Sequence, residues 1–108
     1  MSKILARVNA MRIAQRTPDT SGYFRLIDDF IAGRMTAPEF QKSFLIALKF
    51  ENRGLDDRLF DVLQRLFEDT DDYVAYPELR TDPEDLDDEQ LRECAIRARR
   101  ELRDLGYE

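Results

Sequence analysis

The chain has 108 residues, a formal net charge of −6, one cysteine and no histidine. This length suits a single domain, and hydrophobic residues, at 43%, are too frequent for a disordered chain. Without histidine the chain cannot build a Ser–His–Asp or Cys–His arrangement, and one cysteine permits no internal disulfide. Because an acidic protein attracts basic partners and repels nucleic acid and anionic membranes, we expect a binding protein that contacts neither.

The first 20 residues form a basic segment. Its apolar residues follow a helical spacing: Ile4, Leu5, Val8 and Met11. Its bases precede any acid: Lys3, Arg7, Arg12 and Arg16. The pattern predicts either a short helix or a frayed extension over residues 1–20, in front of a helical domain over residues 21–108.

The N-terminal segment shows no secretory signal, because polar residues interrupt its apolar positions. Nowhere does an apolar run approach the ~20 residues of a membrane span, and the apolar face of this segment is too narrow for a membrane-surface helix. We therefore expect a cytoplasmic protein.

Two helices are predicted in the first half of the domain. Residues 23–32 place their large apolar side chains on one face, and Gly33 is a suitable left-handed end. Thr36 and Glu39 then form a capping-box pattern that starts a second helix. Its core face has these residues: Ala37, Phe40, Phe44, Ala47 and Leu48. The short connection predicts an antiparallel hairpin.

Two more helices are predicted in the second half. Asp56 or Asp57 caps a third helix with an apolar stripe: Leu59, Phe60, Leu63, Leu66 and Phe67. Asp87 and Gln90 form a second capping-box pattern before a helix over residues 88–104, which Gly106 closes. We predict a buried, inert Cys94 on this helix and a solvated arginine face: Arg97, Arg99, Arg100 and Arg103. The predicted fold class is all-α, an antiparallel four-helix bundle with an additional N-terminal helix or tail.

An acidic stretch over residues 68–89 joins the last two predicted helices. It has one base, Arg80, and eleven acids: Glu68, Asp69, Asp71, Asp72, Glu78, Asp82, Glu84, Asp85, Asp87, Asp88 and Glu89. The acids at 87–89 interact favourably with the positive N-terminal end of the last helix. Those at 68–72 lie at the negative C-terminal end of the third helix, where the helix dipole disfavours them. The charge there is either solubilising or made to meet a basic partner. Tyr73 and Tyr76 either pack back onto the bundle or face that partner.

Metal and catalytic sites are not predicted in this stretch. Asp69 and Asp71 begin like a calcium loop, but Tyr73 and Val74 stand where an oxygen ligand and a glycine belong. Zinc lacks ligands in a chain without histidine. Carboxylates in so hydrophilic a stretch lack the burial that raises a pKa for acid–base work. We predict no cofactor, no metal and no enzymatic activity.

Three segments resemble the colicin D-like bacterial self-protective immunity proteins: residues 30–40 (FIAGRMTAPEF), 63–73 (LQRLFEDTDDY) and 77–91 (PELRTDPEDLDDEQL). The resemblance lies in their order and spacing and extends from Tyr23 to Leu105. It implies a small helical bundle that binds a cognate nuclease toxin, often one attacking tRNA, and blocks its active site. Residues 1–20 have no counterpart in this resemblance.

From this resemblance we expect a monomer that forms a 1:1 complex with a basic toxin domain. The expected partner-binding residues are Glu68, Asp69, Asp71, Asp72, Tyr73, Tyr76 and Glu78. Their carboxylates would pair with toxin lysines and arginines, and the tyrosines would supply contact area. One alternative is an acidic adaptor or nucleic-acid mimic that masks another basic protein, and another is a bundle whose loop is only solubilising.

Overall fold

The structure, a computed structural model, describes residues 19–107, so the helix or tail predicted before them lies outside the described residues. Within this part the chain is all-α, as predicted, with four α-helices and one 3₁₀ turn. They are α2 (Ser21–Ile31), α3 (Ala37–Lys49), α4 (Asp57–Asp72), η1 (Pro77–Leu79) and α5 (Asp88–Asp104). None of the described helices is long and apolar enough to cross a membrane.

The helix ends follow the predicted local signals. The capping boxes at Thr36 and Asp87 are both formed, each with its side chain and backbone bonds in place. Asp56 caps α4 by accepting from two backbone N–H groups of the first turn. Gly33 and Gly106 end α2 and α5 with φ of +83° and +103°, which only glycine adopts without strain.

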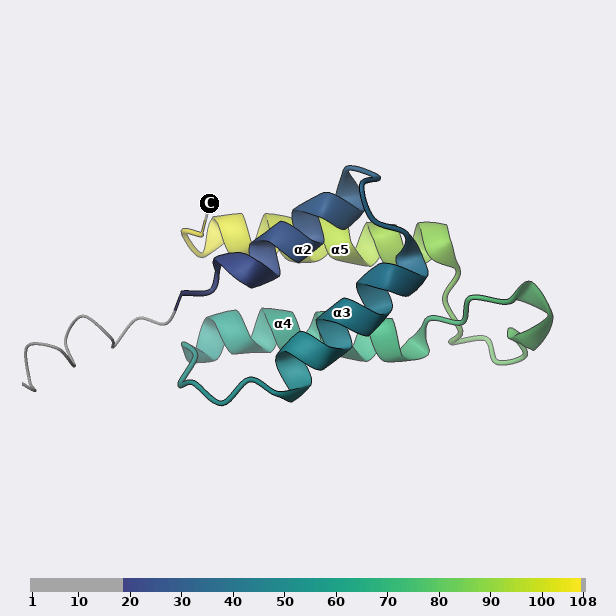
Figure 1. Cartoon of the computed structure of the whole chain (residues 1–108), viewed down its shortest axis with the longest axis horizontal. Helices are drawn as coiled ribbons and strands as arrows, with labels where there is room; N and C mark the ends of the chain where they lie inside the picture. The colour runs from purple at the N-terminus through teal and green to yellow at the C-terminus, as the bar shows by residue number, and fades with distance from the viewer. Residues whose placement is uncertain (1–18, 108) are drawn as a thin grey trace, which may run out of the picture.

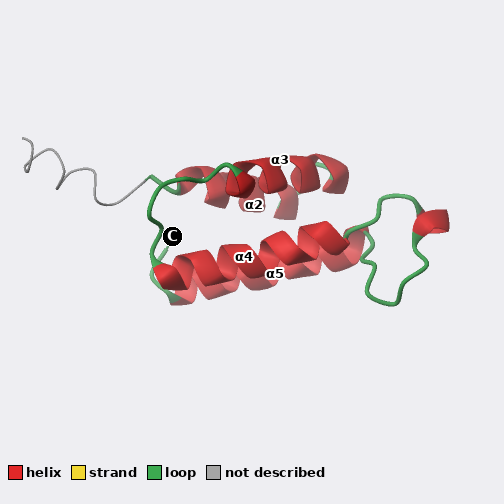
Figure 2. Ribbon diagram, turned by 90° about the horizontal axis from the view of Figure 1, so that it is seen from below, coloured by secondary structure: helices red, strands yellow, loops and turns green. Residues whose placement is uncertain are grey.

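The four helices form two layers (Figures 1 and 2). α2 and α3 make one layer, and α4 and α5 lie side by side in the other, with α2 packed on α5 and α3 packed on α4. Aromatic rings of α2 and α3 are fully buried in the core. Phe30 stacks on Phe40 at 4.6 Å between ring centroids, and Phe40 on Phe44 at 5.4 Å. These rings share one buried cluster with side chains of the other layer, among them Leu63 and Leu102, so the two layers have a common core.

The predicted arginine face is wrong in part, because two of its members bind acids from other helices. Arg99 is buried, and its Nε donates to Asp28 of α2 at 2.9 Å. Arg97 donates to Asp69 of α4 at 2.6 Å. These acids lie 71 and 28 residues away along the chain, so no helical spacing predicts the pairs.

Two apolar assignments are also corrected. Phe60, predicted in the core, is 41% exposed at the edge of the α4 stripe. Cys94 is half-buried rather than fully buried. Loss of hydration raises the pKa of its thiol, which supports the predicted inert role because less thiolate is present at neutral pH.

Candidate protein-binding surface

The acidic residues at 68–72 belong to the last turns of α4, not to a loop as predicted. The helix continues because a partner from α3 holds its end. Gln41 donates from Nε2 to the carbonyl oxygens of Thr70 at 2.9 Å and Tyr73 at 3.1 Å. These bonds satisfy carbonyl groups that a helix C-terminus leaves without intrahelical donors. The acids therefore stand on a fixed helical surface.

These four acids divide into one structural residue and three exposed ones. The carboxylate of Asp69 is held by Arg97, and its side chain is only 20% exposed. Glu68, Asp71 and Asp72 are exposed, and none forms an ion pair with any residue between 19 and 107. Thus Asp69, predicted as a contact residue, is already occupied in the free protein.

Asp72 shows the electrostatic character of this surface. Its pKa is raised, first by partial loss of hydration and then by repulsion from four neighbouring carboxylates: Asp71, Asp69, Asp85 and Asp82. The negative end of the α4 dipole acts in the same direction. Carboxylates that repel one another gain by meeting a cation.

The structure separates the two tyrosines for which both orientations were considered. Tyr73 is 4% exposed, and its hydroxyl donates to Asp88 at 2.5 Å. Burial and this carboxylate raise the pKa of Tyr73. Tyr76 is 63% exposed. Tyr73 therefore packs back onto the bundle, contrary to its predicted role as a contact residue, whereas Tyr76 is free to face a partner.

Beyond α4, residues 73–87 form a loop that projects from one end of the bundle, with η1 at its tip (Figures 1 and 2). Its two ends are joined at the neck. The N–H of Val74 donates to the carbonyl of Leu86, and the N–H of Leu86 to the carbonyl of Asp72, each at 3.0 Å. The two ends of the loop are thus bonded to each other where they leave the bundle.

The projecting loop is also bonded from within. Arg80, the only base in the acidic stretch, turns inward and donates to the carbonyls of Val74 at 2.7 Å and Ala75 at 3.2 Å. Asp82 and Asp85 close a turn through mutual backbone and side-chain bonds. The single positive charge therefore organises the backbone, and the outer surface of the loop stays acidic.

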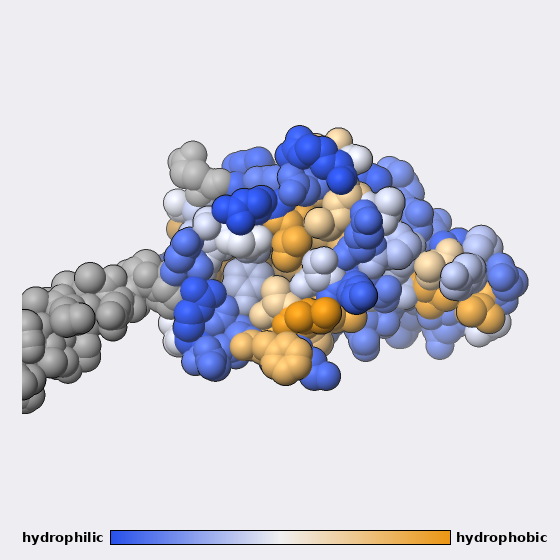
Figure 3. Space-filling model, in the orientation of Figure 1, coloured by the Kyte–Doolittle hydropathy of each residue, from blue (hydrophilic) through white to orange (hydrophobic). Residues whose placement is uncertain are grey.

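Apolar side chains gather at the tip of this loop (Figure 3). Tyr76 and Leu79 are 63% and 59% exposed, and Glu78 between them is exposed as well. Leu79 is absent from the predicted site residues. The sequence does contain a signal for this residue. Leu79 is an apolar residue in an acidic, proline-containing loop, and it belongs to no helical apolar stripe that would bury it.

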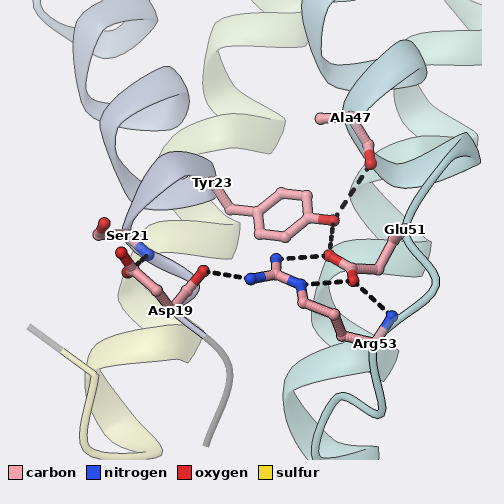
Figure 4. A network of polar contacts seen from close by, with 6 residues as sticks. All are labelled: Asp19, Ser21, Tyr23, Ala47, Glu51 and Arg53. Carbon is pink, nitrogen blue, oxygen red and sulfur yellow. Dashed lines mark hydrogen bonds and ion pairs between the residues drawn. The ribbon is translucent and has the colours of Figure 1, made fainter. Parts of the chain in front are cut away.

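We define the acidic end as Glu68, Asp71 and Asp72 of α4 together with the projecting loop 73–87. The opposite end of the molecule is polar in a different way (Figure 4). There Glu51 accepts from Tyr23 at 2.6 Å and from three nitrogens of Arg53 at 2.8 Å, beside a cavity of about 320 Å³. The Arg53 guanidinium lowers the pKa of Glu51 to about 2.

Comparison with known protein families gives a match over most of the chain. A family described as bacterial self-protective colicin-like immunity matches residues 20–102. The matched range includes all of α2, α3 and α4, the projecting loop and most of α5. No curated protein and no solved structure gives a significant match.

Proposed function

Because the chain belongs to the bacterial self-protective colicin-like immunity family, we propose that it binds a cognate nuclease toxin and covers the toxin's basic active-site cleft with its acidic end. Membership of the family supports an immunity role and a toxin protein as partner. Within this proposal, we assign that role to the acidic end.

The observation that carries the proposal is the set of exposed carboxylates without ion-pair partners among residues 19–107. Glu68, Asp71 and Asp72 sit where the α4 dipole disfavours them, and the pKa of Asp72 is raised by partial loss of hydration and then by repulsion from neighbouring acids. Such an arrangement costs stability in the free protein. It becomes favourable when lysines or arginines approach, since charge-assisted hydrogen bonds replace repulsion.

We propose a nuclease that cleaves tRNA as the toxin, which is the class that the family resemblance implies. Such an enzyme needs a positive cleft to hold phosphates. Carboxylates of the acidic end would occupy the phosphate positions and exclude the RNA. The opposite fields would steer association toward ~10⁸ M⁻¹s⁻¹ at low salt. The role asks for no catalysis by this chain, and we propose a monomer acting in the cytoplasm in a 1:1 complex.

The proposed contact residues are Glu68, Asp71, Asp72, Tyr76 and Glu78. Two predicted contacts take positioning roles instead. Asp69 holds α4 against Arg97 of α5, and Tyr73 anchors the neck of the projecting loop on Asp88. Neither residue would touch the toxin. Their substitution would alter the position of the contact residues without removing a contact to the toxin.

Co-expression with the product of the neighbouring gene tests the proposed function. We expect the two proteins to co-purify in a 1:1 ratio, and the partner to cleave tRNA only after this chain is removed. Complex formation with a basic protein that has no nuclease activity would instead favour an adaptor. A partner that cleaves tRNA equally with and without the chain would contradict the proposal.

A further inference from the structure

We propose that the projecting loop is an anchor, whose tip inserts Tyr76 and Leu79 into an apolar pocket within the basic cleft of the toxin. This inference rests on the proposed function and adds a feature of the partner, an apolar pocket bordered by lysines and arginines. The carboxylates would set the rate of association, and the tip would set the rate of dissociation.

The position of the two side chains is the first argument. Large apolar residues between positions 19 and 107 are mostly buried, yet Tyr76 and Leu79 are 63% and 59% exposed on a loop that projects from the bundle. Tyr76 precedes η1 and Leu79 is its last residue, and the bond from the N–H of Leu79 to the carbonyl of Tyr76 at 2.9 Å holds the two residues close together. A projecting apolar pair reaches a recess that the flat face of a helix cannot enter.

The order of the loop before binding is the second argument. Its neck is closed by bonds between residues 72–74 and 86, and Arg80 secures the backbone of Val74 and Ala75 from inside. The segment 73–87 has two prolines and no glycine. Each feature reduces the conformational freedom that binding would otherwise remove, so a preordered tip retains more of its contact energy.

The charges around the tip are the third argument, and they specify the partner. Glu78 lies between the two apolar residues in the chain, and Asp72, Asp82 and Glu84 of the acidic end are exposed as well. Arg80 is turned inward, so the rim of the tip is acidic. An apolar centre within a charged rim is typical of binding hot spots, where the rim excludes water and the centre supplies most of the affinity. The complementary surface is an apolar recess with a basic border.

Dissociation kinetics of the double variant Tyr76→Ala/Leu79→Ala test the anchor. The probe is the catalytically inactivated nuclease that co-purifies with the chain. We expect koff to rise at least about thirtyfold, as for hot-spot truncations, with kon within about twofold of wild type. Both substitutions lie on the surface, so an unchanged melting temperature verifies the fold.

A matched control is offered by Ile46 of α3 and Phe50, the residue that follows this helix, an apolar pair exposed to 49% and 71%. Ile46→Ala/Phe50→Ala should leave koff unchanged. Wild-type koff for the tip variant, or an equal rise for the control variant, would overturn the anchor while leaving the immunity role intact. Failure of the proposed function gives a different result, because the wild-type chain would then not bind the nuclease at all.

Discussion

The two ends of this molecule are both rich in polar side chains, but the acids are paired with a base at one end and lie among other acids at the other. At the end shown in Figure 4, Glu51 is enclosed by Arg53 and Tyr23, and its pKa falls to about 2. At the acidic end, Asp72 faces other carboxylates, and its pKa rises. A charge that is paired inside the chain stabilises the fold, whereas a charge left among like charges is available to a partner. The presence of an ion-pair partner therefore separates acids that stabilise the fold from acids that are available for binding, which a count of acids alone does not do.

Removing the paired charge should have the largest effect on stability. We expect Glu51→Gln to destabilise the protein by about 2 kcal/mol, because it weakens charge-assisted bonds to Arg53 at a side chain that is only 7% exposed. Urea denaturation measures the change. Toxin affinity should stay at the wild-type value, and a loss of affinity here would break the distinction between the two ends.

The pH dependence of the same variant sharpens this prediction. The folded-state pKa of Glu51, about 2, lies below its ordinary value of 4.5, so its stabilisation is complete above about pH 4.5 and is lost as the pH falls toward 2. The gap in unfolding free energy between wild type and Glu51→Gln should close over this window. A gap that stays constant down to pH 2 would show that the carboxylate charge has no stabilising role.

Asp69 is the one acid of the 68–72 group that is paired, and it should behave like Glu51. We expect Asp69→Asn to destabilise the protein by about 1 kcal/mol, since Arg97 loses the charge that faces it at 2.6 Å. Thermal unfolding measures the loss. An increase in stability would mean that Asp69 belongs with its exposed neighbours.

Asp72 should show the smallest effect and the opposite sign. We expect Asp72→Asn to raise stability by a few tenths of a kcal/mol at neutral pH, because it removes repulsion and an unfavourable charge at the end of α4. The raised folded-state pKa means that this penalty exists only while the carboxyl is ionised, so the gain should vanish as the pH falls through that pKa. Destabilisation at neutral pH would contradict the account.

Much of the fold follows from local patterns in the sequence. The capping boxes at Thr36 and Asp87 and the glycine ends at Gly33 and Gly106 depend on neighbouring residues only, and all four are confirmed. The end of α4 is different. The helix reaches Asp72 because Gln41 of α3 bonds to its last carbonyls, a contact across about 30 residues of chain that no local pattern contains.

The negative charge of the candidate site could be predicted from the sequence, but the pairing and burial of its individual residues could not. The opposition of carboxylates and helix dipole at Glu68–Asp72 was visible in the sequence. Which acids are paired depends on distant bases, so the ion pair of Asp69 with Arg97 could not be predicted from the sequence. Tyr73 and Tyr76 are equivalent in the sequence and differ only because the neck of the loop buries the first.

The central claim, that the acidic end binds the toxin, is tested most directly by two variants of equal net charge. One is Glu68→Gln/Asp71→Asn/Asp72→Asn, which spares the structural Asp69. The other neutralises three exposed acids near the start of α4 and at the end of α5, at the end of the bundle away from the projecting loop: Asp57→Asn/Asp61→Asn/Asp104→Asn. None of the three forms an ion pair with a described residue. The measurement is kon for the inactivated nuclease as a function of salt concentration.

We expect the first variant to associate at least about tenfold more slowly than wild type at low salt and to lose much of the salt dependence, since its steering charges are gone. The second should keep the wild-type rate within about twofold. Equal slowing of both variants would mean that only net charge matters. A wild-type rate for the first variant would contradict the claim outright.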